Sequence, residues 1–254
     1  MRIFRTPPYH DVPELLDDVS TATPHELETT LRDIRRANIF GLGTWVVKHH
    51  LSRLLSAEPE RGTTLTILDV ATGSADIPQA LLAWAGSTGI EMQIVATDIS
   101  DAILRVARGR IDRTGLAGRV SFATCDASRL PFDDSSFDYA TCSLALHHLD
   151  PRQARAALRE MARVASKGFI VNDIYRSQGA WYMASALATL ATTNRLTRHD
   201  GPASVMRAYT PRELRRLSES AGLRVNVYTH PFWRMAAVGR CLPGVGGQGS
   251  RVGD

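Results

Sequence analysis

The sequence has little cysteine and no long apolar run, and each absence excludes a class of protein. Its 254 residues include 3 cysteines, which form no pair at the spacing of metal ligands and no disulfide framework. No stretch approaches the roughly 18 apolar residues of a membrane span. Residues 1–8 contain no apolar signal core. We therefore expect a cytoplasmic protein with reduced thiols and no membrane partner.

Two familiar functional signatures are also missing. The turn at residues 69–75, which follows the first β-prone run, lacks the G-x-G-x-x-G pattern, and this disfavours an NAD-dependent dehydrogenase. It contains no appended RNA-binding module, and its basic residues are spread over several helices instead of forming one patch. A net charge of +4 is weak evidence for a polynucleotide partner, so none is expected. No pattern predicts an oligomeric state.

The composition is that of an ordinary globular protein, at 44% hydrophobic and 22% charged residues. From residue 65 onward, β-prone runs alternate with helical patterns and short turns. This alternation predicts an α/β fold with a doubly wound, mostly parallel sheet. The runs expected to form parallel strands are 65–70, 93–97, 120–124, 139–143 and 168–171.

The organisation along the chain predicts one main domain with additions. Residues 1–62 are expected to form an N-terminal helical cap, and residues 63–240 the main domain. A helical insertion at about 177–209 interrupts the strand–helix rhythm after the fifth strand, with a polar loop expected around His199. Two antiparallel strands are expected to close the sheet. The glycine-rich segment 241–254 is expected to be a flexible tail.

The most informative stretch is 66–78, where a β-prone run stops at Asp69, turns through small residues and starts a helix. Such a turn holds an anionic or zwitterionic group against backbone N–H groups. A second strand ends at Asp98 after about 30 residues, enough for a strand–helix–strand unit. A carboxylate at that point can accept both hydroxyls of a ribose. Together the two signals predict a cofactor that contains a nucleoside.

Four ordered segments resemble the class I S-adenosylmethionine-dependent methyltransferases, and in particular their ubiquinone/menaquinone-biosynthesis-like branch. They are residues 68–75, 96–98, 125–132, and 136–140 continuing into 146–149. The Asp-Ala…Leu-Pro-Phe segment followed by Ser-Phe-Asp is especially typical of that branch. The resemblance implies a seven-stranded sheet ordered 3-2-1-4-5-7-6 with an antiparallel strand 7, and S-adenosyl-L-methionine as the cofactor.

The resemblance also implies positions in the cofactor site. The turn after Asp69 would face the methionine part, and Asp98 would hold the ribose hydroxyls. Asp126 would accept a hydrogen bond from the adenine amino group, and the N–H of Ala127 would reach a ring nitrogen. Ser143 would line the site of transfer. The residues expected to bind the cofactor are Asp69, Ala71, Thr72, Gly73, Asp98, Ile99, Asp126, Ala127 and Ser143.

The turn departs from the family pattern, which commonly has three alternating glycines. Here the three positions hold Ala71, Gly73 and Ala75. Because alanine resists a positive φ, Gly73 is expected to take the most demanding conformation, and both alanines an ordinary negative φ. The departure leaves open a second interpretation, a non-catalytic protein that binds the cofactor or a partner.

Two histidines are candidate general bases, His147 after the fourth strand and His199 beside Asp200. The alternatives are a packed, hydrogen-bonded histidine for the first and a salt-bridged lid anchor for the second. The adjacent pair His147 and His148 cannot easily share one tetrahedral ion. No third ligand lies nearby in the sequence, so no metal is expected.

Polar residues near the carboxyl ends of strands predict where a substrate binds. Asn172, Asp173, Arg176 and Arg207 are the candidate substrate contacts, and an apolar helix around 181–183 lies beside them in the sequence. These features predict methyl transfer to oxygen or carbon of a small acceptor. The acceptor would be hydroxylated aromatic, quinone-like or polyketide-like, as in secondary metabolism. A tRNA or rRNA methyltransferase is the alternative enzyme, supported by the mild basic charge.

Overall fold

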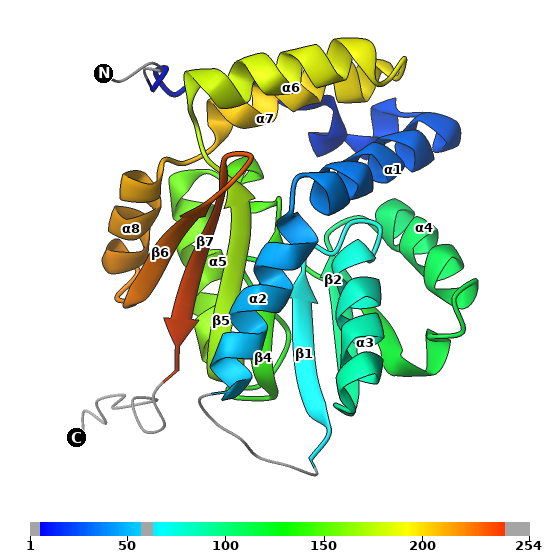
Figure 1. Cartoon of the computed structure of the whole chain (residues 1–254), viewed down its shortest axis with the longest axis vertical. Helices are drawn as coiled ribbons and strands as arrows, with labels where there is room; N and C mark the ends of the chain where they lie inside the picture. Colours follow the sequence, from blue (N-terminus) through cyan, green and yellow to red (C-terminus); the bar gives the residue numbers. More distant parts are fainter. Residues whose placement is uncertain (1–5, 57–62, 242–254) are drawn as a thin grey trace, which may run out of the picture.

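A computed structural model describes residues 6–56 and 63–241, and its centre is a seven-stranded sheet (Figure 1). The strands are hydrogen-bonded in the order β3-β2-β1-β4-β5-β7-β6. β7 is antiparallel to both of its neighbours, and the other pairs are parallel. The predicted fold class and strand order are confirmed. The strands are β1 (Leu65–Val70), β2 (Met92–Asp98), β3 (Val120–Thr124), β4 (Phe137–Ser143), β5 (Ala165–Ile174), β6 (Val225–His230) and β7 (Arg234–Arg240).

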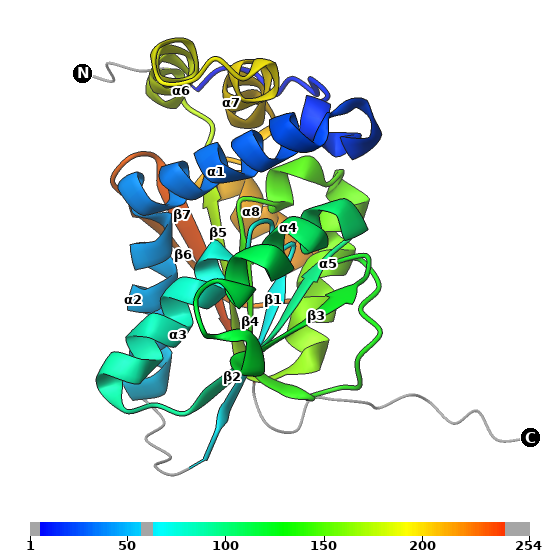
Figure 2. The ribbon, with the colours of Figure 1, turned by 90° about the vertical axis from the view of Figure 1, so that its right-hand side faces the viewer.

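Helices cover both faces of this sheet (Figure 2). One face carries α2 (Gly43–Ser56), α3 (Asp76–Thr88) and α4 (Asp101–Asp112), and the other carries α5 (Pro151–Val164) and α8 (Pro211–Ser220). Ile67 and Leu68 are successive residues of β1 that point into separate apolar clusters on the two faces, and both are fully buried. Central parallel strands that are covered in this way need apolar residues on both sides.

A third group of segments lies over the carboxyl ends of the strands, and we call it the roof (Figures 1 and 2). It consists of α1 (Pro24–Phe40), α6 (Gln178–Leu190), α7 (Arg195–Arg207) and the 3-10 turns η1 (Leu15–Asp17) and η2 (Val19–Thr21). Within it, α7 contacts α1, α6 and η1, and it also contacts the turn η4 (Leu146–His148) that follows β4. The turn η3 (Ala117–Arg119) is not part of the roof and directly precedes β3 in the chain. The predicted insertion after the fifth strand is therefore the pair α6–α7.

The N-terminal helices divide between two layers. Whereas α1 belongs to the roof, α2 packs against the face of the sheet, where Val46, Val47 and Leu51 are fully buried. These three residues lie on one stripe of the helix, which explains why it packs on the sheet instead of capping it. The domain boundaries stay predictions, and the predicted tail beyond residue 241 lies outside the described residues.

The prediction of a polar loop around His199 was wrong, because this segment is helix α7. Its first turn is capped by Asn194, whose side chain accepts the N–H of Leu196 at 3.0 Å. Pro202 lies inside the helix without ending it. All three cysteines are free thiols. Among the described residues, no helix combines the length and apolar character needed to cross a membrane.

Candidate active site

The turn after β1 holds three alternating residues in the left-handed region. Ala71, Gly73 and Ala75 have φ values of 54°, 55° and 55°. The prediction of a negative φ was therefore wrong for both alanines. Ala75 is completely buried at the start of α3, so the turn requires a small side chain there as well as the unusual backbone. Each alanine in this region costs about 1–2 kcal/mol relative to an ordinary conformation.

Replacing Ala71 with glycine is therefore expected to stabilise the chain by about 0.5–1 kcal/mol. Glycine removes the strain, and its greater freedom in the unfolded chain offsets part of the gain. Urea unfolding with an unchanged m-value would measure the difference. Ala80→Gly in the middle of α3 is the control, and it is expected to destabilise by about 1 kcal/mol. If Ala71→Gly loses as much stability as the control, the backbone at Ala71 is not strained.

Two buried carboxylates connect this turn to its neighbours. Asp98 ends β2, and its Oδ2 and Oδ1 accept the N–H groups of Gly73 and Ser100, each at 3.1 Å. Burial raises the pKa of Asp98. Asp69 lies within β1, where its Oδ1 accepts the hydroxyl of Thr141 from β4 at 2.6 Å, and burial raises its pKa to about 7. Asp69 is thus held inside the sheet, whereas Asp98 anchors the turn at its edge.

The remaining predicted cofactor residues follow the same edge. Asp126 lies two residues after the end of β3 and is exposed, and its Oδ1 accepts both the N–H and the hydroxyl of Ser128 at 2.8 Å. The backbone of Asp98 accepts the N–H of Cys125 at 3.0 Å, which joins the two strand ends. Ile99 leaves an apolar side chain 71% exposed beside them. Because β3, β2, β1 and β4 are neighbours, the tips that carry these residues line one continuous edge.

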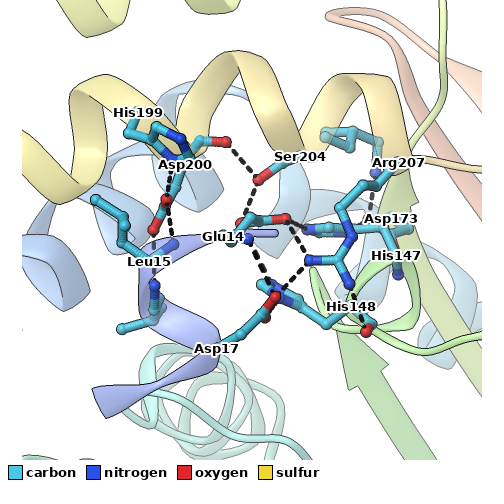
Figure 3. Close-up of polar contacts among 12 residues, drawn as sticks. Glu14, Leu15, Asp17, His147, His148, Asp173, His199, Asp200, Ser204 and Arg207 are labelled. Carbon is cyan, nitrogen blue, oxygen red and sulfur yellow. Dashed lines mark hydrogen bonds and ion pairs between the residues drawn. The ribbon is translucent and has the colours of Figure 1, made fainter. Parts of the chain in front are cut away.

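A second polar cluster lies beside this edge, around His147 (Figure 3). Nδ1 of His147 lies 2.7 Å from Oδ1 of Asp173 on β5, and both side chains are buried. Burial acts to raise the pKa of Asp173, but the adjacent His147 holds it below its ordinary value. An ionised carboxylate can accept but not donate, so we assign the proton to Nδ1. In the neutral form of His147, the lone pair is then on Nε2.

The N-terminal segment and α7 complete this cluster (Figure 3). Glu14 accepts the hydroxyl of Ser204 at 2.7 Å, and burial raises its pKa to about 7. Asp17 lies 2.7 Å from Nδ1 of His148 and accepts a hydrogen bond from Arg207 at 2.6 Å. Sequence reasoning missed Glu14, Asp17 and Ser204. Glu14 and Ser204 are 190 positions apart, and no local spacing connects them.

Asp200 fastens the N-terminal segment to α7. Its carboxylate accepts the N–H groups of Leu15 and Leu16 at 2.7 and 3.0 Å. Nδ1 of His199 lies 2.9 Å from the same carboxylate, and its side chain is 44% exposed. The structure therefore places His199 on the outer part of α7, away from His147 in Figure 3. Its catalytic role stays a prediction.

The two predicted substrate arginines are buried and make polar contacts within the chain. Arg176 donates to the carbonyl oxygens of Pro7 and Ala208 at 3.1 and 2.5 Å and to Glu213 at 2.7 Å. Besides Asp17, Arg207 donates to the carbonyl oxygen of His148 at 2.8 Å. Both side chains hold the N-terminal segment and α7 in place, and a direct contact with a substrate stays a prediction.

Asn172 and the aromatic residues of α6 lie in contrasting surroundings. Asn172 is fully buried in β5 and donates to the hydroxyl of Ser143 at 2.6 Å. Within the described part of the chain, its Oδ1 has no hydrogen-bond partner. Trp181 and Tyr182 are 36% and 55% exposed, so these parts of the predicted apolar helix lie at the surface instead of in a closed pocket. Asn172 thus lies between two parts of the site. Its side chain contacts Ser143 at the edge of the sheet, and its neighbour in β5 is Asp173, the partner of His147.

Comparison with known proteins identifies the family of the segment that carries this edge of the sheet. Residues 67–168 match the family described as a methyltransferase domain, and this stretch runs from β1 into β5. The chain contains a class I S-adenosylmethionine-dependent methyltransferase domain. The cofactor of this domain class is S-adenosylmethionine, as the resemblance implied.

The methyltransferase domain is similar to a named enzyme over part of its length. It is 37% identical over 102 residues to the ubiquinone/menaquinone biosynthesis C-methyltransferase UbiE of Ectopseudomonas mendocina. That match covers 40% of this chain and 38% of the relative, so it spans about two fifths of each protein.

Solved structures share the fold of the methyltransferase domain at lower identity. The magnesium protoporphyrin IX methyltransferase of Synechocystis, solved with S-adenosylmethionine bound, is 14% identical with a TM-score of 0.53. That match covers 82% of this chain and 84% of the other. A chain from the complex of the Haloferax volcanii Trm112 methyltransferase activator with a methyltransferase is 19% identical with a TM-score of 0.54. That match covers 85% of this chain and 97% of the other. These likenesses support the fold.

Proposed function

We propose that this chain transfers a methyl group from S-adenosylmethionine to oxygen or carbon of a small hydroxylated aromatic, quinone-like or polyketide-like acceptor. The position of the roof is the observation that supports a small acceptor. It lies across the carboxyl ends of the strands (Figures 1 and 2). In α1, Leu31 comes within 4.0 Å of the place that a Cβ on Gly73 would occupy. An acceptor must fit beneath these helices, which favours a small molecule over a folded RNA.

The donors and acceptors at the edge fit the proposed cofactor. Asp98 accepts the backbone N–H groups of Gly73, Ser100 and Ile99, and a carboxylate has about four acceptor positions, so it can also accept a ribose hydroxyl. We assign the adenine to Asp126 and the N–H of Ala127, beside the exposed Ile99. The methionine part is assigned to the turn at Ala71, Thr72 and Gly73, with Asp69 and Ser143 as its neighbours. The unpartnered Oδ1 of Asn172 among the described residues offers a further acceptor next to Ser143.

The chain itself needs to position the acceptor and to exclude water. Bound S-adenosylmethionine supplies a methyl group on a sulfonium whose leaving group is neutral. The acceptor atom must lie about 3–3.5 Å from the methyl carbon, in line with the bond that breaks. We assign the acceptor's hydroxyl to Nε2 of His147, which Asp173 orients from behind. A hydrogen bond to this nitrogen raises the electron density on the hydroxyl oxygen and on the conjugated ring carbons.

The UbiE relative adds support for the class of acceptor and for its location. Its name places it in quinone biosynthesis as a C-methyltransferase, which favours a quinol-like ring and carbon as the methylated atom. The free thiols of Cys125, Cys142 and Cys241 fit a reducing compartment and support the cytoplasm. We keep residues 63–240 as the catalytic domain, with the roof as its cover.

A panel of acceptors tests this proposal. The full chain is incubated with methyl-labelled S-adenosylmethionine and with resorcinols, naphthoquinols or unmodified tRNA and rRNA transcripts. Label is expected in at least one phenolic or quinol product and to disappear with excess S-adenosylhomocysteine. Methylation of RNA without any small product would contradict the proposal. Failure to bind the cofactor by calorimetry would instead favour a non-catalytic binding protein.

A further inference from the structure

Three potential metal ligands from distant parts of the chain face one another beneath α7 (Figure 3). They are a carboxylate oxygen of Glu14 and one nitrogen each of His147 and His148, all within 4.8 Å of one another. Nε2 of His147 lies 3.7 Å from Oε1 of Glu14, and Nε2 of His148 lies 3.8 Å from Oε2. The sequence offered no third ligand for the histidine pair, and the fold supplies Glu14. Both separations exceed a hydrogen bond.

Each imidazole is oriented from behind by its own carboxylate. Nδ1 of His147 lies 2.7 Å from Asp173, and Nδ1 of His148 lies 2.7 Å from Asp17. With the protons on Nδ1, both Nε2 lone pairs are available on the side where Glu14 lies. Metal-binding histidines usually donate their second ring N–H to a carboxylate or a carbonyl in this way. The arrangement therefore presents two prepared nitrogen ligands.

The third ligand has an oxygen that accepts no hydrogen bond from the residues that the structure describes. The side chain of Glu14 is 3% exposed, and its buried Oε1 makes no hydrogen bond to any residue that the structure describes. A buried carboxylate oxygen without a partner is costly. Nη1 of Arg207 is 3.7 Å away, in the range of an ion pair. This oxygen is aimed at the space in front of the imidazoles.

The charges of the cluster in Figure 3 also favour a cation. Asp17, Asp173 and Asp200 contribute three carboxylates, Glu14 adds a fourth when it is ionised, and Arg207 contributes one guanidinium that faces Glu14 and Asp17. While the histidines are neutral, the residues drawn there carry more negative than positive charge. A divalent ion between the imidazoles and Glu14 would offset this excess.

The donor set selects the kind of ion. A first-row divalent ion with bonds of about 2.0–2.2 Å holds neighbouring ligand atoms about 3.0–3.6 Å apart. The observed separations of 3.7 and 3.8 Å run to different oxygens of Glu14, and the three ligand atoms lie within 4.8 Å of one another. Binding of an ion therefore needs the Glu14 carboxylate and the imidazoles to move closer together. Two imidazole nitrogens and one carboxylate suit zinc and its transition-metal neighbours, whereas calcium and magnesium prefer oxygen ligands. Three protein ligands leave a position open.

We propose that Glu14, His147 and His148 bind one divalent transition-metal ion with an open position for an oxygen ligand. The binding of the ion is independent of the proposed function, and its use in catalysis rests on that function. In that use, Nε2 of His147 binds the ion and no longer accepts the acceptor's hydroxyl directly. The hydroxyl oxygen binds the ion instead, and its O–H bond breaks with loss of the proton to solvent. For an oxygen acceptor, this oxygen then forms a bond to the methyl carbon. The S–CH₃ bond breaks, its electron pair stays on sulfur, and S-adenosylhomocysteine is released.

A zinc titration of the full chain tests the binding. The protein is stripped with EDTA, dialysed and titrated with Zn²⁺ in a calorimeter, without acceptor. One ion per chain is expected, and His148→Ala and Glu14→Gln are each expected to weaken binding at least tenfold. Co²⁺ is expected to give a visible absorption band that both variants lose. His230→Ala is the matched control, because it disrupts another close histidine pair, His50 and His230, whose Nε2 atoms are 2.9 Å apart.

His148→Ala keeps the test informative if Glu14→Gln fails to fold. The side chain of His148 is 25% exposed, and far-UV circular dichroism checks the fold of each variant. The absence of saturable zinc binding, or equal binding by wild type and His148→Ala, would overturn the site. Full methyl transfer by the stripped chain would overturn the catalytic use of the ion and leave the proposed function standing. Zinc binding by a chain that methylates no acceptor would support the site and count against the proposed function.

Discussion

Asp98→Ala is expected to abolish binding of S-adenosylmethionine while the chain stays folded. The substitution removes the two oxygens that we assign to the ribose hydroxyls. It also removes the acceptor that holds the N–H of Gly73 in the turn after β1. A hydrogen bond to a charged group contributes about 1.5–3 kcal/mol, so loss of two is expected to raise the Kd at least about 100-fold. Calorimetry measures the Kd, and far-UV circular dichroism checks the fold.

Two further variants make this result interpretable. Asp112→Ala removes an exposed carboxylate from the last turn of α4 and is expected to leave the Kd unchanged. Asp98→Asn keeps an oxygen for the N–H of Gly73 but loses the charge, so an increase of about tenfold in Kd is expected. A folded Asp98→Ala chain that binds the cofactor within threefold of wild type would contradict the assignment of the ribose.

His147→Asn is expected to lower kcat for methyl transfer about 100-fold or more, with the Kd for the cofactor changed less than threefold. The asparagine amide can take the place of Nδ1 as donor to Asp173, which avoids a buried carboxylate without a partner. It has no counterpart of Nε2, the atom that we assign to the acceptor's hydroxyl. Steady-state kinetics with the best acceptor from the panel measures the effect.

A separate control tests whether replacing a histidine outside the proposed site also lowers kcat. His25 is exposed in the first turn of α1, and His25→Ala is expected to retain the wild-type kcat. If kcat of His147→Asn stays within threefold of wild type, His147 does not contact the reacting hydroxyl. If cofactor affinity falls as much as kcat, the histidine supports the fold of the site instead of the acceptor.

The sheet and the residues along its edge could be predicted because their signals are local. Asp98 directly follows a β-prone run and Asp126 lies two residues after another, and parallel strands place such residues at the same edge. The resemblance then supplied the order of the strands, which no local pattern contains. For this reason the fold and the strand order agree with the prediction. The predicted cofactor residues lie along one edge of the sheet, and their role in binding stays a prediction.

The parts that could not be predicted depend on tertiary structure. The intrinsic preference of Ala71 and Ala75 is for negative φ, and the packing of the turn overrides it. The segment around His199 contains a proline and polar residues, yet contacts with α1, α6 and η1 stabilise it as helix α7. Glu14 reaches His147 through the path of the N-terminal segment beneath α7. No spacing along the chain indicates that path.

A crystal structure of the chain with bound S-adenosylhomocysteine tests the cofactor assignment most directly. We predict the ribose hydroxyls on Asp98, the adenine beside Asp126 and the amino-acid part against the turn at Gly73, all beneath the roof. The sulfur is expected next to Ser143, on the side of His147. A nucleoside bound elsewhere, or an edge at which these side chains do not contact it, would contradict the assignment.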